Sequence, residues 1–414
     1  MKYKVLMLLV IALGIFLRLY RLPDLSSFSY EQALALEASG NMIQTGNISL
    51  IGVEYFIRQT SANHRFFNSA AYLYPIFLTQ LIFGFDPIYP AIIFSLLNIA
   101  AGIGLFFLVD KYFKKPLGII ALILYMFSPT MVEISRTVWH VYLLVPIIVL
   151  SIWTFLKYIH SCKPIWLILL GISLGLGFGM HISYLIGMVV ILLACIGSFY
   201  KKRKIINLIF LIIGFLIGYS PIVLFDIRHN FYNTSTMFTF LVESFTNRNS
   251  GFSFTSYYSI YLLVPLYIFI SILLRKLFSP KLITLLLFLY IVICSSGWHL
   301  TDTYPSGMPR GTNIKTIAKI SSTIVGDVSG EFEVASILDG ETRAENLRYY
   351  LEFVDHKAPM ASDKYPEAKV IYVISYLDQD PQTKSVWELN SMKPVKIVNE
   401  WSINDLIKLT KLQK

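Results

Sequence analysis

The chain has 414 residues, of which 55% are hydrophobic and only 14% are charged, and its mean hydropathy is +0.62. Ordinary globular domains carry roughly 25% charged residues, so this composition excludes a disordered chain, a fibrous protein and a single soluble enzyme domain. Residues 1–299 hold 21 Lys and Arg against 9 Asp and Glu, whereas residues 300–414 hold 14 against 16. We therefore predict a polytopic membrane domain over residues 1–299 and a small soluble α/β domain over residues 300–414. The cations lie in short runs between apolar segments, which indicates membrane topology and not a nucleic-acid partner.

Apolar runs, taken in chain order, predict about nine membrane crossings. A helix needs about 20 mostly apolar residues to cross roughly 30 Å of hydrocarbon. Runs of this kind lie at residues 4–20, 88–109, 116–134, 139–158, 164–180, 183–199, 205–226, 256–274 and 281–298. No small-residue cleavage site follows the first run, so we interpret it as a retained anchor helix. Glycines in two later runs, Gly171 and Gly175 in one and Gly214 and Gly218 in the other, predict close helix packing.

The charges of the linkers predict the orientation of the bundle. Four linkers and the amino terminus carry 14 cations against one acid, Asp110. The positive-inside rule places all of them in the cytoplasm. This arrangement requires residues 21–87 to form one long external loop, in which the apolar stretch 66–85 is an interfacial helix that does not cross the membrane. The amino terminus is then cytoplasmic and the carboxyl-terminal domain is exoplasmic.

The carboxyl-terminal segment shows shorter apolar patterns. We predict strands at residues 331–338, 369–377 and 396–401, the second of them central because it is almost continuously apolar. Amphipathic spacing predicts helices at residues 341–354 and 403–412. These elements form the small α/β domain.

Polar residues at the predicted outer ends of the membrane helices are candidates for a functional site, because burying ionisable groups there is costly. The candidates are Tyr30, Glu31 and Gln32, then Arg136 and His140, then His181, and finally Arg228 and His229. Each group also has a structural interpretation. Glu31 suits a helix start, Arg136 could pair with Glu133, His181 could be a packing residue, and Arg228 could contact a lipid headgroup. Together they predict one external site in which the carboxylate acts as a general base and the arginines hold a phosphate.

Three short motifs carry a family resemblance. They are Phe28-Ser29-Tyr30-Glu31-Gln32-Ala33, then Phe127-Ser128-Pro129 followed by Ser135-Arg136 and Trp139-His140, and then Pro221 with Phe225-Asp226-Ile227-Arg228-His229-Asn230. With them, roughly residues 1–300 resemble the integral-membrane C-type glycosyltransferases, a group similar to the dolichyl- or polyprenyl-phosphate-mannose protein mannosyltransferases and the aminoarabinose transferases (glycosyltransferase family 39-like). The resemblance implies hexosyl or pentosyl transfer, with inversion, from a polyprenyl-phosphate donor. The acceptor would be a lipid, glycan or protein hydroxyl of the cell envelope, at the outer face of the cytoplasmic membrane.

The sequence departs from the family pattern at two places. Glu31-Gln32 replaces an Asp-Glu pair, and His140-Val141 stands where many members carry an acid. With fewer acids a divalent metal is not favoured, and we expect no cofactor. The implied partners are the lipid-linked donor, the envelope acceptor and membrane lipids. Two alternatives stay open, a transporter or lipid flippase and a catalytically inactive envelope scaffold, although the scarcity of charges at helix midplanes disfavours transport.

Overall fold

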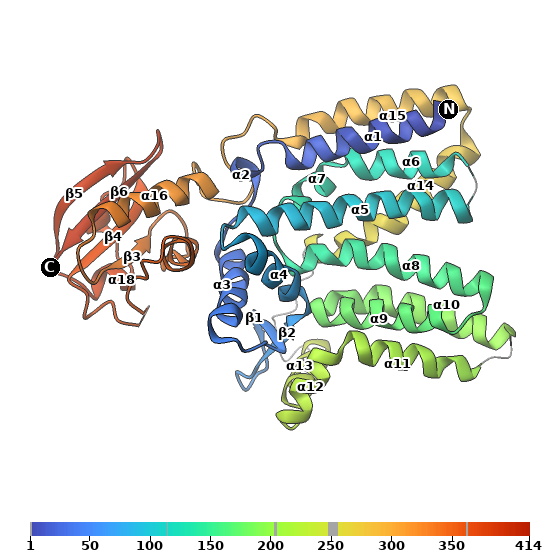
Figure 1. Ribbon diagram of the computed structural model, residues 1–414, viewed down its shortest axis with the longest axis horizontal. Coiled ribbons are helices and arrows are strands. Elements are labelled where there is room, and N and C mark those ends of the chain that lie inside the picture. The colour runs from blue at the N-terminus through green and yellow to red at the C-terminus, as the bar shows by residue number, and fades with distance from the viewer. Residues whose placement is uncertain (1, 114, 203–204, 247–255, 362) are drawn as a thin grey trace.

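A computed structural model describes residues 2–113, 115–202, 205–246, 256–361 and 363–414. Long helices lie side by side in one bundle, and a four-stranded sheet with its own helices lies beyond one end of that bundle (Figure 1). The segment that contains α3, β1, β2 and α4 lies between the two parts (Figure 1). The candidate site residues before position 100 are in this middle segment.

Five helical segments within the described residues are long and apolar enough to cross a membrane. They are Ile88–Tyr112 (α5), His140–Ser161 (η2, His140–Leu143, and α8, Leu144–Ser161), Ile182–Tyr200 (in η3, Ile182–Tyr184, and α10, Leu185–Lys202), Tyr258–Leu277 (in η5, Ser256–Leu262, and α14, Leu263–Leu277) and Pro280–Trp298 (α15, Pro280–Ser295, and η6, Ser296–Trp298). Two further pairs of consecutive helices are, taken together, long and apolar enough to cross a membrane, but each pair is bent. They are α6 (Leu117–Phe127) with α7 (Pro129–Ser135), bent by 62°, and Ile205–Gly218 (η4 and α11) with α12 (Ser220–Arg228), bent by 72°.

These helices make the chain a multi-pass membrane protein, while the count of nine crossings stays a prediction. The two other expected crossings form α1 (Lys2–Leu19) and α9 (Ile165–Met180), and α9 has only 16 residues. The predicted close packing of glycines is confirmed between α9 and α11 (Leu208–Gly218). A Cβ added at Gly214 would collide with the backbone oxygen of Ile168, and one at Gly171 with that of Leu211.

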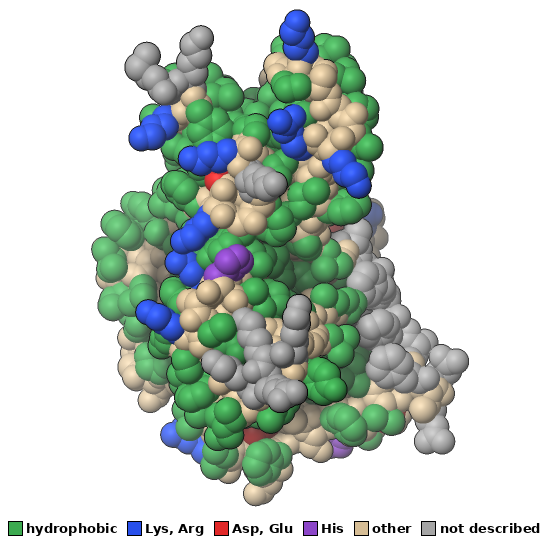
Figure 2. All heavy atoms as spheres, turned by 90° about the vertical axis from the view of Figure 1, so that its right-hand side faces the viewer, with side chains coloured by type: hydrophobic (Ala, Val, Ile, Leu, Met, Phe, Trp, Pro, Cys, Tyr) green, Lys and Arg blue, Asp and Glu red, His purple; other side chains and the backbone are tan. Residues whose placement is uncertain are grey.

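The predicted basic linkers share one end of the bundle. The turns between α5 and α6, α8 and α9, α10 and α11, and α14 and α15 all lie at the end opposite the sheet, together with the amino terminus (Figure 1). Figure 2 looks onto this end, where many Lys and Arg side chains and very little acidic surface are visible among the described residues. Lys114, Arg203 and Lys204 of the predicted set lie outside the described residues. The clustering is the one that the positive-inside rule requires of a cytoplasmic face.

The segment 21–87 contains more regular structure than the sequence indicated. It forms α2 (Leu22–Leu25), α3 (Tyr30–Thr45), the antiparallel strands β1 (Ile51–Gln59) and β2 (Arg65–Ser69), the turn η1 (Ala70–Tyr72) and α4 (Leu73–Phe83). The expected helix over residues 66–85 therefore begins only at residue 70, because its first residues pair with β1. Side chains of α4 such as Leu81 and Ile82 are exposed, as a lipid-facing helix would require.

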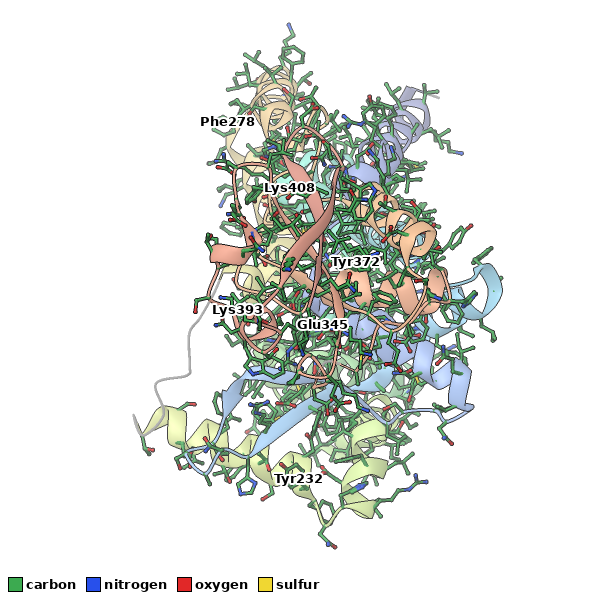
Figure 3. The ribbon with its side chains drawn as sticks, turned by 90° about the vertical axis from the view of Figure 1, so that its left-hand side faces the viewer. Tyr232, Phe278, Glu345, Tyr372, Lys393 and Lys408 are labelled. Atoms are coloured by element: carbon green, nitrogen blue, oxygen red, sulfur yellow. The ribbon has the colours of Figure 1, made fainter. Side chains whose placement is uncertain are left out.

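The carboxyl-terminal sheet has the strand order β3-β4-β6-β5, with β3 parallel to β4 and the other pairs antiparallel. The three predicted strands are confirmed as β3 (Glu333–Ser336), β4 (Val370–Tyr376) and β5 (Lys396–Ser402). The predicted helix over residues 403–412 is wrong, because β6 (Ile407–Gln413) pairs with β4 along its whole length. The predicted helix over residues 341–354 is α17 (Glu345–Tyr349) continued by a π-helical turn, and α18 (Trp387–Asn390) follows later. Figure 3 looks onto this sheet, with Tyr372 on β4 and Lys408 on β6 in front of the bundle.

Helix α16 (Ile314–Asp327), which the sequence analysis did not predict, ties the sheet to the amino-terminal segment. The Nζ of Lys315 lies 2.9 Å from the carboxylate of Asp24, which also pairs with Arg21 at 3.2 Å. Asn346 Nδ2 donates a hydrogen bond of 3.0 Å to the carbonyl of Phe28, two residues before α3. The segment that leads into α3 is therefore held by contacts from the carboxyl-terminal domain.

Candidate active site

Two neighbouring cavities lie where α3, the β1–β2 hairpin and the turn after α7 meet. The larger, of about 390 Å³, is lined by α3 and by Asn68, His140, His181 and Tyr258. The smaller, of about 180 Å³, is lined by Gln32, Arg136 and the segment 297–307. Glu31 and Trp139 line both cavities. Glu31 therefore stands at the junction, with the predicted phosphate-binding arginine on one side and the two histidines on the other.

The position of Glu31 follows from the way in which α3 begins. Ser29 is the N-cap, and its backbone N–H and its hydroxyl both donate to Oε1 of Gln32, at 2.9 and 2.6 Å. This capping box satisfies backbone donors that an uncapped helix would leave unpaired. Gln32 is thereby committed to the helix start and is buried. The side-chain amide of Gln32 therefore stabilises the helix cap. The replacement of the family's Asp-Glu pair by Glu31-Gln32 did not by itself indicate this role.

Glu31 follows the cap in the first turn of the helix and has no charged partner among the described residues. Although the side chain is exposed to the cavities, desolvation by the surrounding protein raises the pKa of its carboxyl above the usual range of glutamate, and no neighbouring cation counteracts the shift. Its exposed surface faces the cavities that it lines. A carboxylate with a raised pKa and open space beside it has the properties of a general base.

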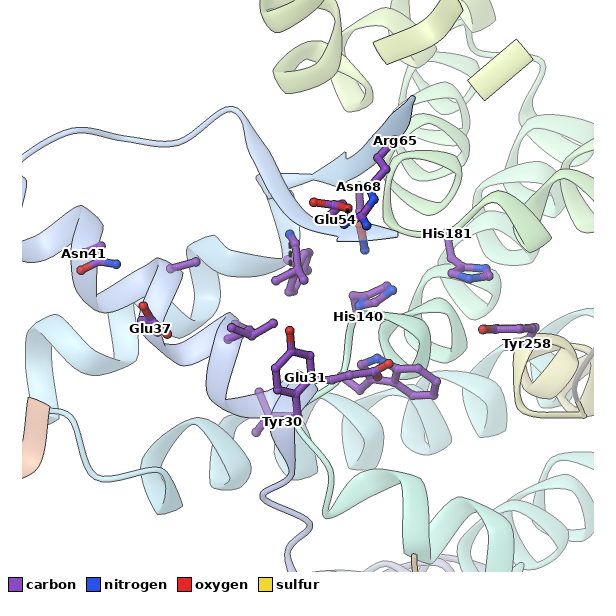
Figure 4. Close-up of a pocket in the computed structure, with 17 residues that line it drawn as sticks. Tyr30, Glu31, Glu37, Asn41, Glu54, Arg65, Asn68, His140, His181 and Tyr258 are labelled. Atoms are coloured by element: carbon purple, nitrogen blue, oxygen red, sulfur yellow. Dashed lines mark hydrogen bonds and ion pairs between the residues drawn. The ribbon is translucent and has the colours of Figure 1, made fainter. Parts of the chain in front are cut away.

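Glu37 lies further along α3 and lines only the larger cavity. Burial, together with the charges of Glu345 and Glu352, raises its pKa to about 7. Figure 4 places Glu37 and Asn41 at one side of the cavity and His140, His181 and Tyr258 at the other. Glu31 therefore lies nearer than Glu37 to the histidines.

Arg136 is held by main-chain oxygens. Its guanidinium donates to the carbonyls of Leu17, at the end of α1, and of Trp298, the latter at 3.2 Å. The residue is buried, and its Nε has no hydrogen-bond partner among the described residues. The proposed alternative, a salt bridge with Glu133, does not form. Only the backbone N–H of Arg136 bonds to the carbonyl of Glu133. A buried cation with an unused donor beside a cavity can attract a phosphate.

The two predicted histidines lie together at the larger cavity. The rings of His140 and His181 stack with centroids 5.8 Å apart, and the His181 ring stacks on Tyr258 at 4.4 Å. The Nδ1 of His181 accepts a hydrogen bond from the backbone N–H of Ser183 at 3.1 Å, which fixes the orientation of the ring. The histidines therefore form one wall of the cavity, as the sequence grouped them.

Arg228 and His229 are not brought to either cavity. Both are exposed at the end of α12, and the His229 ring stacks on Phe225 at 4.1 Å. The buried member of their motif is Asp226. Its carboxylate accepts hydrogen bonds from the backbone N–H groups of Asn233, at 2.8 Å, and of Thr234 at the start of α13 (Tyr232–Phe245). Asp226 therefore stabilises the start of α13, and no residue of the motif lines either cavity.

The sequence analysis missed two features of the larger cavity and one buried arginine that lines neither cavity. Glu54 and Arg65 form an ion pair of 2.5 Å across the β1–β2 hairpin and line the larger cavity. Asn68 lines it as well. Arg18, in α1, is fully buried and donates to Asn98 Oδ1 and to the carbonyl of Met126, each at 3.0 Å. Predicting a hairpin between residues 51 and 69 would have revealed the first two features.

Among the described residues, no group of three or more His, Cys, Asp and Glu side chains is arranged to hold a metal ion. The larger cavity offers the carboxyl groups of Glu31, Glu37 and Glu54 and the side chains of His140, His181 and Asn68, whereas Arg136 lines the smaller cavity.

Comparison with known proteins bears on this geometry. The profile of the family described as dolichyl-phosphate-mannose-protein mannosyltransferase matches residues 70–225, which include Arg136, His140 and His181 but not Glu31. The predicted family resemblance is confirmed.

Solved structures share the fold over nearly the whole chain. The structure of ArnT from Cupriavidus metallidurans bound to undecaprenyl phosphate superposes with a TM-score of 0.65 at 11% sequence identity, and covers 99% of this chain and 98% of its own. The apo state of the same protein gives a TM-score of 0.56 at the same identity and coverage. No curated protein sequence matches the chain. At this identity the structural likeness establishes the fold alone.

Proposed function

We propose that this protein transfers a sugar from a polyprenyl-phosphate-linked donor to a hydroxyl of a cell-envelope lipid, glycan or protein. The observation that carries the proposal is the position of Glu31 at the junction of two cavities, with a buried arginine in one and two histidines in the other. The family resemblance and the undecaprenyl phosphate bound to the structural neighbour support a lipid-phosphate donor.

Each group has a role that its surroundings favour. Glu31 removes the proton from the acceptor hydroxyl, whose oxygen attacks the anomeric carbon from the face opposite the leaving group. The bond between that carbon and the phosphate oxygen breaks as the new glycosidic bond forms, so that the configuration inverts and the polyprenyl phosphate leaves with the electron pair. Arg136 stabilises the phosphate charge from the smaller cavity. His140, His181 and Tyr30 bind the sugar or the acceptor in the larger cavity, and Gln32 positions Glu31 through the helix cap. The reaction as proposed uses no cofactor.

The basic end of the bundle supports our proposal for the orientation in the membrane. With that end in the cytoplasm, the hairpin and the carboxyl-terminal sheet lie on the outer side (Figure 1), and so do the cavities lined by α3 and the hairpin. We propose that residues 1–299 form the transferase domain and residues 300–414 an exoplasmic domain that braces the segment that leads into α3. The contacts of Lys315 with Asp24 and of Asn346 with Phe28 support this role.

The test is a transfer assay with the purified full chain in proteoliposomes. Undecaprenyl phosphate carrying a labelled sugar is the donor, and an extract of envelope lipids and glycans supplies acceptors. We expect the label to move to an acceptor while undecaprenyl phosphate appears in equal amount, both measured by mass spectrometry. Movement of intact donor between the leaflets without release of sugar would favour the flippase. Absence of both sugar transfer and donor movement would favour the scaffold.

A further inference from the structure

An amide group in the wall of the larger cavity has no partner to explain its burial. Asn68 has 2% of its surface exposed, and its Oδ1 accepts no hydrogen bond from any described residue. It lines the cavity, and Figure 4 shows its side chain pointing from β2 toward His140. Leaving a buried polar atom unpaired is costly, so such atoms in folded proteins call for an explanation.

The strand that carries Asn68 is fixed on both sides of this residue. The backbone N–H of Phe67 donates to Oδ1 of Asn233 at 2.7 Å, and Asn233 Nδ2 donates back to the carbonyl of Phe67 at 3.1 Å. On the other side, the hydroxyl of Ser69 caps the turn η1 by accepting a hydrogen bond of 3.2 Å from the backbone N–H of Ala71. The amide of Asn68 therefore cannot easily turn away to find a partner elsewhere.

The pair of hydrogen bonds between Asn233 and Phe67 is itself positioned by the buried Asp226. The carboxylate of Asp226 accepts a hydrogen bond of 2.8 Å from the backbone N–H of Asn233. This bond fixes the residue whose side chain is hydrogen-bonded to the backbone of Phe67. The motif around residues 225–230 thus acts on the cavity from outside it, through α13 and β2. A chain of buried hydrogen bonds that positions an unpaired amide is typical of a preorganised binding site.

The chemistry of the group identifies what would satisfy it. An amide offers an acceptor oxygen and donor N–H groups a short distance apart, which matches two neighbouring hydroxyls of a sugar. The ion pair of Glu54 with Arg65 lies on the same hairpin and supplies further polar lining. We infer that Asn68 is a specificity-determining residue that binds a hydroxyl pair of the donor sugar in the larger cavity. This inference rests on the proposed transferase function and adds to it the place and the contact of the sugar.

The test compares the affinity of the purified protein in detergent for two kinds of lipid. One is undecaprenyl phosphate, and the other is undecaprenyl phosphate carrying glucose, mannose, galactose or arabinose. We expect at least one sugar to increase the affinity. In the Asn68→Leu variant, affinity for that sugar-bearing lipid should fall roughly five- to a hundredfold, as expected for one or two lost hydrogen bonds. Affinity for bare undecaprenyl phosphate should stay within about twofold of the wild-type value.

The matched control is Asn47→Leu, the same substitution at an exposed amide between α3 and β1 that lines neither cavity. It should leave both affinities unchanged. The thermal midpoint of Asn68→Leu without ligand should be equal to or above that of the wild type, because an apolar side chain replaces an unpaired amide. A purely structural asparagine would lower the midpoint. If the leucine prevents folding, Asn68→Ala, which adds no volume, is measured in the same way.

Three results would overturn the inference, and they differ from failure of the proposed function. Equal affinity of the wild type for bare and sugar-bearing lipids would overturn it, as would an unchanged sugar contribution in the Asn68 variants. A loss confined to the Michaelis constant of a glycan acceptor would move the hydroxyl contact from donor to acceptor and refute the assignment. By contrast, absence of any binding of undecaprenyl phosphate to the wild type would refute the transferase proposal itself.

Discussion

Replacing Arg136 by Met should have two separable effects. The guanidinium bonds to the carbonyls of Leu17 and Trp298, and its removal leaves both oxygens without this partner. Hydrogen bonds from charged groups contribute about 1.5–3 kcal/mol each, so the loss in folding stability should be about 3–6 kcal/mol. The substitution should therefore lower the thermal midpoint of the purified protein even without a ligand.

The second effect concerns the donor phosphate. At free undecaprenyl phosphate one hundred times above its Kd, the lipid should stabilise the wild type by about 2.7 kcal/mol. If the loss of Arg136 weakens binding tenfold, the same lipid concentration should stabilise the variant by only about 1.4 kcal/mol, and by about 0.4 kcal/mol if the loss is a hundredfold. Arg136→Lys should recover part of both effects, because lysine keeps the charge but lacks the planar fork.

Thermal unfolding in detergent, with and without undecaprenyl phosphate, measures both effects. The control is Arg228→Met, since Arg228 is exposed and lines neither cavity, and it should change neither the midpoint nor the contribution of the lipid. A lower midpoint of Arg136→Met with an unchanged lipid contribution would make Arg136 purely structural. An unchanged midpoint would refute the carbonyl contacts.

Further predictions follow from the pKa values, the helix packing and the topology. Desolvation by the surrounding protein raises the pKa of Glu31, and a base must be ionised, so kcat/KM should fall as the pH decreases through a value above the usual 4.5, as measured in a pH–rate profile. Glu37 has a pKa raised to about 7, so the folded state binds the additional proton between pH 4.5 and 7 and loses stability as the pH rises through this window. Glu37→Gln should therefore raise the thermal midpoint at pH 8 and hardly change it at pH 4, with little effect on transfer. Gly214→Leu should separate α9 from α11 and prevent accumulation of folded protein, whereas a midpoint within about 2 °C of the wild type would contradict the packing seen there. A cysteine at Ser61 should react with an impermeant thiol reagent from outside intact cells and one at Lys163 should not, and the reverse pattern would invert the topology.

Hydropathy and local chemistry predicted the parts of the fold in which neighbours along the chain decide the structure. The long helices follow from continuous apolar runs, and the contact of α9 with α11 follows from glycines at helical spacing, because only a missing side chain allows backbones to approach so closely. The strand at residues 370–376 was predicted by its continuous apolar run, which suits a central strand covered on both faces.

The errors occurred where distant pairing decides the structure. Residues 403–412 carry apolar positions at helical spacing, but β4 requires a partner on its second edge, and β6 supplies it. The β1–β2 hairpin escaped prediction because β2 leads directly into an apolar helix and was interpreted as its beginning. Asn68 could not be singled out from the sequence, because its importance lies in the absence of a partner, which only the folded chain reveals.

The same distinction applies to the site. Glu31, Arg136, His140 and His181 lie around the two cavities because each lies at the end of a helix, and the helix ends on one side of the bundle lie close together. Arg228 also lies at such an end, but the 72° bend before α12 directs it away from the cavities.

The central claim is that Glu31 acts as the base in sugar transfer, and single-turnover transfer by Glu31→Gln tests it most directly. Donor and protein are mixed at saturating concentrations in proteoliposomes, acceptor is added, and the rate is measured alongside the Kd of the donor in the same preparation. The account predicts a Kd within about twofold of the wild type and a rate lower by roughly 10²–10⁴-fold, the usual contribution of a general base. A variant that transfers sugar at the wild-type rate would contradict the account.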